Sequence, residues 1–129
     1  MKKKFKIAAL IILLITIVFS GVFYFYFWLP HQKMIDINWL NSASPKEQRD
    51  VAHQVLKLPY GNYHDAYLIL IHDGNNESIP ILLNRLKHFK KDKNFRVCTE
   101  THCLKALQKI TGKKIGYDYE KWKKELTNK

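Results

Sequence analysis

The sequence lacks the short motifs that mark common enzyme classes. It contains no Ser-His-Asp elbow, phosphate-binding loop, paired-carboxylate motif or H-E-x-x-H zinc motif. The pairs His64-Asp65 and His72-Asp73 come closest to acid–base groups, but adjacent residues of a helix point in different directions, whereas proton transfer needs hydrogen-bond reach. We therefore expect no enzymatic activity, no catalytic residue and no cofactor.

Cysteine is scarce, and its placement excludes one kind of anchor. The two cysteines are Cys98 and Cys103, and neither lies in or just after the amino-terminal apolar run, so a lipoprotein anchor on a cysteine is excluded. With His102 they form a C-x3-H-C pattern, in which Cys98 and His102 are one helical turn apart. A fourth zinc ligand is missing nearby, so we expect no metal site.

Acidic residues are half as frequent as basic ones, at 11 against 22, and the run Ile7–Leu29 contains no charge of either sign. That run holds 20 apolar residues out of 23, whereas residues 30–129 hold 38 out of 100, so the chain has two parts. About 100 residues is a normal size for one domain, which excludes multidomain architectures and most large catalytic folds. Periodic apolar groups in this second part argue against a disordered tail.

The apolar run is long enough to cross a bilayer, since as a helix it would measure about 34 Å. Tyr24, Tyr26 and Trp28 near its end predict an aromatic belt in the headgroup layer. Four lysines within residues 1–6 predict a cytoplasmic tail, a transmembrane helix over residues 7–29 and an exoplasmic domain. The sequence therefore predicts a single-pass cell-membrane protein, held in the bilayer by residues 7–29, with its carboxy-terminal domain periplasmic or extracellular.

Secretion after cleavage of a signal peptide is the alternative, because residues 7–19 make an acceptable h-region and Val18-Phe19-Ser20 precedes Gly21. Cleavage there would leave an exposed apolar tail, so we favour the uncleaved anchor.

Export in either form favours a disulfide between Cys98 and Cys103. Residues five apart within a helix are separated by about 7.5 Å along its axis, so this bond requires a helix that begins after Cys98. Thr99 as an N-cap predicts such a start.

The exported part is predicted to contain a juxtamembrane linker over residues 30–43 and an all-α domain of about five helices over residues 44–129. Ser44-Pro45-Lys46-Glu47 combines an N-cap serine, a proline in the first turn and a capping-box glutamate. Residues 90–94 are predicted to form a solvated charged loop. The expected caps and stops of the other helices are Asn62, Gly74, Thr99, Gly112 and Asp118, which place helices near 63–73, 77–89, 99–110 and 118–126.

Two helix pairs have the spacing of a repeat. Gly74 and Gly112 each lie in a turn between helices and are 38 residues apart, close to the period of helix-pair solenoids. The segments His64–Lys87 and His102–Leu126 resemble the HEAT-like repeats of phycobilisome lyases, which occur in many bacterial proteins. The first has an alanine-containing helix, a glycine turn and a hydrophobic helix with an early proline, and the second has Ile-Thr-Gly, Gly-Tyr-Asp and a late tryptophan. This resemblance implies a short helical-hairpin solenoid that serves as a protein-binding scaffold, with no catalytic residue to transfer.

Basic residues concentrate in 85–96 and 105–129. Export argues against nucleic acid, which leaves anionic lipid headgroups, acidic cell-wall polymers or an acidic protein, beside the simpler interpretation of a solvated lysine-rich surface. We predict a non-catalytic interaction module that binds another envelope protein on the concave side formed by its second helices. An immunity or inhibitor protein of the envelope is one alternative, and a tetrapyrrole lyase or chaperone is another. The predicted partner surface comprises Arg85, Lys87, Lys121 and Lys124.

Overall fold

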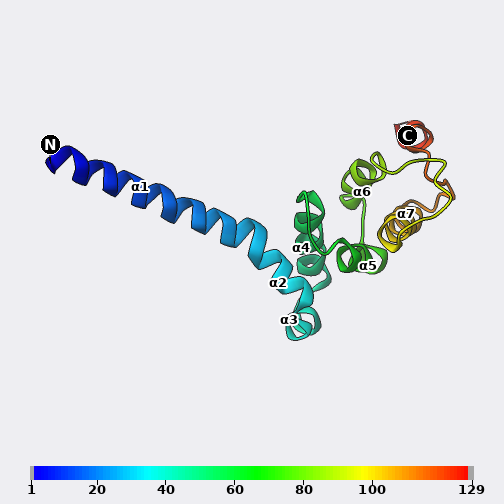
Figure 1. Cartoon of the computed structure of the whole chain (residues 1–129). Coiled ribbons are helices and arrows are strands. Elements are labelled where there is room, and N and C mark those ends of the chain that lie inside the picture. The colour runs from blue at the N-terminus through cyan, green and yellow to red at the C-terminus, as the bar shows by residue number, and fades with distance from the viewer. Residues whose placement is uncertain (1, 128–129) are drawn as a thin grey trace.

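The structure is a computed structural model that describes the backbone of residues 2–127 and the side chains of residues 5–127. Over this range the chain is all-helical and contains no β-strand. A long amino-terminal helix extends away from a group of shorter helices that form one domain (Figure 1). The all-α prediction is thereby confirmed for the described residues.

The long helix consists of α1 (Lys2–Phe23), the π-helical turn η1 (Tyr24–Trp28) and α2 (Leu29–Ile35), which follow one another without a break. Over Phe5–Ile35 it is long and apolar enough to cross a membrane, and none of its most apolar part is buried against the domain. It is the one helix with these properties in the part of the chain that the structure describes.

The stretch predicted as a linker is helical over most of its length. Helix α2 covers its first part and α3 (Ile37–Ser42) its second part. Asp36 separates the two helices, and its Oδ1 accepts hydrogen bonds from the amides of Asn38 at 2.9 Å and Trp39 at 3.3 Å. Met34 is 1% exposed and lies in the domain core, so this stretch belongs to the packed domain and is not a loose tether.

Five further helices follow, in the number and order that the sequence predicts: α4 (Pro45–Lys57), α5 (Tyr63–Asp73), α6 (Ser78–Leu86), α7 (Cys98–Thr111) and α8 (Tyr119–Thr127). Several of their boundaries differ from the prediction, most of them by one residue. Helix α6 ends at Leu86, before Phe89, and α7 begins at Cys98, before Thr99. The N-cap of α7 is Val97, which makes no side-chain capping bond, so the prediction of Thr99 as the cap was wrong.

The other predicted caps are present. The Glu47 amide donates to Ser44 Oγ at 3.3 Å, while the Ser44 amide donates to Glu47 Oε2 at 2.8 Å, which completes the capping box. Asn62 Oδ1 accepts from the Asp65 amide, and Asp118 Oδ1 accepts from the Lys121 amide. Gly112 ends α7 in the left-handed region with φ 70°, a conformation that favours glycine. Local polar signals therefore set most helix ends.

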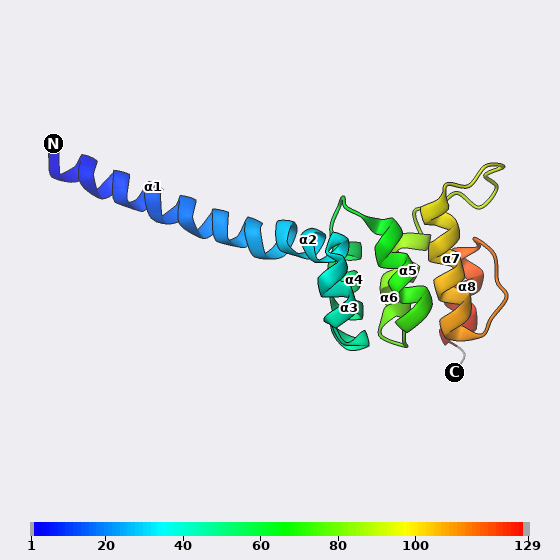
Figure 2. The same ribbon diagram turned by 90° about the horizontal axis from the view of Figure 1, so that it is seen from below.

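Helices α5 and α6 lie in the middle of the domain (Figure 2). Helix α5 contacts α4 and α7, whereas α6 contacts α4, α7 and α8, and α2 packs on α4. Figure 1 shows α4, α6 and the last helix on one side of the domain and α5 and α7 on the other, and Figure 2 shows the successive pairs lying side by side. The core between them consists of Met34, Ala52, Val55, Leu56, Ala66, Tyr67, Leu70, Leu82, Leu86, Cys103, Ala106, Leu107, Ile115 and Trp122.

Candidate functional site at the junction of the anchor helix and the domain

Pro30, the first residue of the stretch predicted as a linker, lies inside the long helix. Proline has no amide hydrogen, and its ring crowds the carbonyl four residues earlier, so an ordinary α-helical turn is disfavoured. The preceding turn is π-helical, and the Leu29 amide donates to the carbonyl of Tyr24, five residues back. This wider turn carries the helix across the proline, so the helix Phe5–Ile35, called the anchor helix below because it is long and apolar enough to cross a membrane, continues into the domain.

Gln54 of α4 contacts the backbone of the anchor helix where a donor is missing. An amide at residue 30 would donate to the carbonyl of Tyr26 in an α-helix or of Phe25 in a π-helix, and proline supplies none. The Gln54 side-chain amide lies 3.4 Å from the Tyr26 carbonyl oxygen and 3.5 Å from that of Phe25. A domain side chain thus replaces the donor that Pro30 removes.

The loop after α4 makes a second contact with the anchor helix, through Tyr60 and Gly61. The His31 ring packs so closely on Gly61 that a Cβ atom on this glycine would lie 2.0 Å from His31 Cε1. Tyr60 stacks on Phe27 with ring centres 6.2 Å apart and on His31 at 6.5 Å. Pro30 is also buried. Together with buried Met34, these contacts fix the direction in which the anchor leaves the domain.

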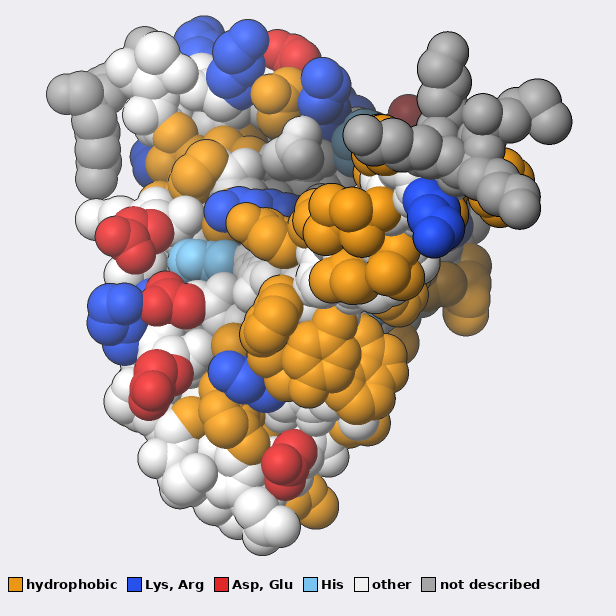
Figure 3. Space-filling view, turned by 90° about the vertical axis from the view of Figure 1, so that its left-hand side faces the viewer, with side chains coloured by type: hydrophobic (Ala, Val, Ile, Leu, Met, Phe, Trp, Pro, Cys, Tyr) orange, Lys and Arg blue, Asp and Glu red, His pale blue; other side chains and the backbone are white. Residues whose placement is uncertain are grey.

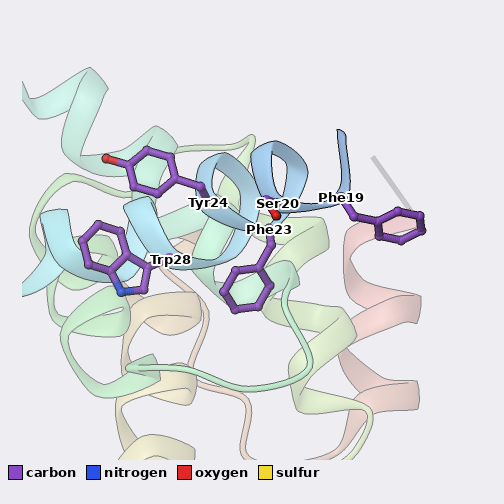
Figure 4. A pocket seen from close by; sticks show the side chains of 5 residues that line it. All are labelled: Phe19, Ser20, Phe23, Tyr24 and Trp28. Atoms are coloured by element: carbon purple, nitrogen blue, oxygen red, sulfur yellow. The ribbon is translucent and has the colours of Figure 1, made fainter. Parts of the chain in front are cut away.

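The predicted belt residues lie just before this junction. Tyr24, Tyr26 and Trp28 are all exposed, and Tyr24 stacks on Trp28 with ring centres 5.3 Å apart. Tyr24 and Trp28, with Phe19, Ser20 and Phe23, border a shallow hollow on the helix surface (Figure 4). The hollow is mostly apolar, so lipid chains would fill it in a bilayer. The position of the belt in a headgroup layer stays a prediction.

A more polar pocket of about 430 Å³ lies between Tyr26 and α4, lined by Tyr26, Asp50, His53, Gln54, Lys57 and Leu58. Asp50 is engaged by Lys46, with Nζ 2.7 Å from Oδ2. His53 Nε2 lies 2.7 Å from Ser78 Oγ, and burial lowers the pKa of this imidazole, which favours its neutral form at neutral pH. Lys57 is exposed and has no ion-pair partner among residues 5–127, so it is the available cation of the pocket.

The predicted partner surface divides into two kinds of residue. Lys87 at the end of α6 and Lys121 and Lys124 on α8 are exposed, and none of them forms an ion pair with another described residue. Arg85 is different: it is partly buried, and its guanidinium carbon lies 4.0 Å from the centre of the Tyr63 ring. This cation–π contact joins α6 to α5, so Arg85 contributes to packing of the domain.

The two cysteines are free thiols, so the predicted disulfide is not formed. Cys98 is the first residue of α7, and the helical start after Cys98 that the bond required does not occur. Cys103 lies on the buried side of the same helix, where its thiol donates to the carbonyl of Leu82 at a sulfur–oxygen distance of 3.6 Å. Burial raises the pKa of Cys103 to about 12.

We expect a maleimide to modify Cys98 in the folded protein and to leave Cys103 unmodified. The thiolate is the reacting form, and Cys103 is both 0% exposed and held as the thiol, whereas Cys98 is exposed. Intact-mass measurement after brief treatment should show one adduct on the native chain and two after denaturation. Cys98→Ser should leave the native chain without an adduct. Two adducts on the folded wild-type chain would contradict this assignment.

The histidine–aspartate pairs differ from the expectation. His64 Nδ1 lies 3.1 Å from Asp65 Oδ1, and His72 Nδ1 lies 3.1 Å from Asp73 Oδ1, so adjacent side chains do reach each other. His64 also meets the ring of His102 edge to face at 4.8 Å between centres. Within residues 5–127, however, no group of three or more His, Cys, Asp or Glu side chains is placed to hold a metal ion.

The charged loop between α6 and α7 is tied to the domain rather than free in solvent. Lys93 Nζ lies 3.0 Å from Oε1 of the largely buried Glu100, and Lys91 Nζ lies 2.7 Å from Asp118 Oδ2. Arg96 places its guanidinium carbon 3.7 Å from the centre of the Tyr117 ring. These lysines and this arginine are therefore occupied, which leaves less free positive charge than the sequence suggests.

No protein-family model, curated protein or solved structure matches this chain. The resemblance to HEAT-like repeats therefore stays a prediction made from the residues. The structure itself shows an all-helical fold over the described residues, with one helix that is long and apolar enough to cross a membrane.

Proposed function

We propose that this protein is a membrane-anchored, non-catalytic interaction module whose helical domain binds another protein of the cell envelope. The observation that carries the proposal is the continuity of the anchor with the domain. The most apolar part of the helix is exposed, whereas Met34 near its carboxy-terminal end lies in the domain core. An exposed apolar surface of this length calls for lipid, and a domain joined to it without a hinge would be presented at a constant angle.

The packing supports a HEAT-like array as the binding scaffold. Helices α4, α6 and α8 contact in sequence, while α5 contacts α7, and this is the two-row order expected when helix pairs stack. Pairs of this kind cannot cover their apolar faces alone, so each stacks on the next. Such arrays bind partners on the surface of one row, which here would be the surface of α6 and α8.

Exposed charge favours an acidic partner on the exoplasmic side. Lys87, Lys121 and Lys124 project from α6 and α8 and lack ion-pair partners among residues 5–127. The lysines of residues 1–6 favour a cytoplasmic amino terminus, which puts the domain on the opposite face of the membrane. Complementary charge would speed the encounter with the partner and set its orientation.

A photo-crosslinker at the exposed residue Asn84 of α6, in the full-length chain in native membranes, should capture one specific envelope protein with an acidic surface. The double charge reversal Lys87→Glu with Lys124→Glu should lower the yield by at least about tenfold, because like charges facing each other cost several kcal/mol. The matched control reverses Lys105 and Lys109, which are exposed on α7 in the other row. Equal losses in both double variants, or no adduct above background, would count against the proposal.

A further inference from the structure

We propose that the pocket between Tyr26 and α4 binds the phosphate group of an anionic glycerophospholipid of the surrounding bilayer. This proposal rests on the membrane anchoring proposed above, and it names a lipid ligand in addition to the protein partner. The pocket is formed jointly by the anchor helix, through Tyr26, and by the domain, through Lys57 and its neighbours on α4.

The position of the pocket along the axis of the anchor helix is set by hydrogen bonds between Gln54 and that helix. Gln54 lines the pocket and also contacts the carbonyl oxygens of Phe25 and Tyr26. The carboxy-terminal part of α4 is therefore held at the height of Tyr24, Tyr26 and Trp28 along the anchor axis. Aromatic side chains at the end of an apolar helix lie in the headgroup layer, so the pocket opens at the level of lipid phosphates.

The groups around the pocket suit a phosphate with an apolar tail. The Lys57 ammonium and the Tyr26 hydroxyl are donors that a phosphate oxygen can accept from, and Leu58 provides an apolar wall. Asp50 also lines the pocket, and its negative charge would repel an anion. Its ion pair with Lys46, with Nζ 2.7 Å from Oδ2, weakens that repulsion. Figure 3, seen from the amino-terminal end of the helix, shows hydrophobic side chains gathered on one part of this face and acidic and basic side chains on other parts of it.

The source of the phosphate follows from the same geometry. Tyr26 is 61% exposed and precedes the junction on the apolar helix, so an occupant of the pocket is in contact with the bilayer surface. A lipid can place its phosphate at Lys57 while its chains remain in the hydrocarbon layer along α1. A soluble phosphate could accept from the Lys57 ammonium and the Tyr26 hydroxyl, but it has no acyl chains to place against the apolar helix. We therefore assign the pocket to a lipid headgroup.

The test uses the full-length chain in detergent, stripped of lipid and offered equal amounts of phosphatidylglycerol and phosphatidylcholine. Native mass spectrometry should show retention of phosphatidylglycerol in preference to phosphatidylcholine. Lys57→Gln should lower that retention at least about fivefold, because it removes the charge-assisted hydrogen bond from the ammonium to the phosphate. Lys105→Gln, an equally conservative change at an exposed lysine of α7, should retain the lipid as the wild type does.

The outcomes separate the two proposals. Equal retention of both lipids by the wild type, unchanged retention by Lys57→Gln, or displacement of the lipid by millimolar inorganic phosphate would each overturn the lipid assignment. Carbonate washing of native membranes is the companion measurement. A chain that stays in the washed membranes but retains no phosphatidylglycerol refutes the pocket alone, whereas a chain that the wash removes refutes the anchoring as well.

Discussion

Trp122→Ala is expected to lower the free energy of unfolding of the helical domain by about 3–5 kcal/mol, the usual cost of removing a large buried aromatic side chain. Trp122 is 0% exposed and is the largest of the fully buried side chains. Its indole Nε1 also donates to the carbonyl of Gly116 at 2.8 Å, which ties α8 to the segment before it. A domain of this size has a total stability of about 5–15 kcal/mol, so the variant should be marginal.

Urea denaturation of the full-length chain in detergent, followed by circular dichroism, measures this loss. Trp28→Ala is the matched control, because it deletes the same atoms from an exposed position outside the core. Trp122→Phe keeps most of the volume but loses the indole donor, so its midpoint should lie between those of the wild type and Trp122→Ala. Equal midpoints for Trp28→Ala and Trp122→Ala would show that this side chain does not hold α8 in place.

Helix positions could be predicted because their determinants are local. The capping box of Ser44 and Glu47 and the caps of Asn62 and Asp118 each use residues three apart, so their sequence spacing was sufficient. Gly112 was likewise recognisable, since an αL residue after a helix favours glycine. The error at Thr99 shows the limit: this threonine does not act as the cap, because the N-cap of α7 is Val97, two residues earlier.

Side-chain roles were less predictable because they depend on tertiary packing. Arg85 was assigned to the partner surface on its charge, but the Tyr63 ring of a neighbouring helix covers its guanidinium. A disulfide between Cys98 and Cys103 was predicted because export favours disulfide formation. The two residues are free thiols, and α7 begins at Cys98 rather than after it. In each case, the deciding contact or boundary had no pattern in the sequence.

The junction was missed for the same reason. Gln54 is an ordinary polar residue of an amphipathic helix, and its bonds to the anchor span 28 and 29 residues of sequence. The sequence predicted a transmembrane helix that ends at residue 29 and a linker that begins at residue 30, which is a proline, and proline usually ends a helix when no other group compensates. The donor that accommodates Pro30 comes from α4, which only the fold brings close.

Gly61→Ala is expected to release the anchor helix from the domain while leaving the domain folded. Gly61 has φ 150°, where a side chain costs about 1–3 kcal/mol, and its added Cβ would lie 2.0 Å from the His31 ring. His31 must then move away from Gly61, and its stacking on Tyr60 and the burial of Pro30 and Met34 next to it are weakened. The angle between anchor and domain should change from one value to a broad range.

Spin labels on Cys98 and on Val22→Cys report this angle, because Cys103 is buried and Val22 is exposed on the anchor helix. The wild-type background should give one narrow distance distribution, and Gly61→Ala should broaden it. Gly116→Ala is the control, since an added Cβ there meets no atom within 4 Å. A distribution that stays narrow in Gly61→Ala would mean that Gln54 and Met34 hold the junction without His31. The presentation of the domain at a fixed angle would then depend on α4 and α2 alone.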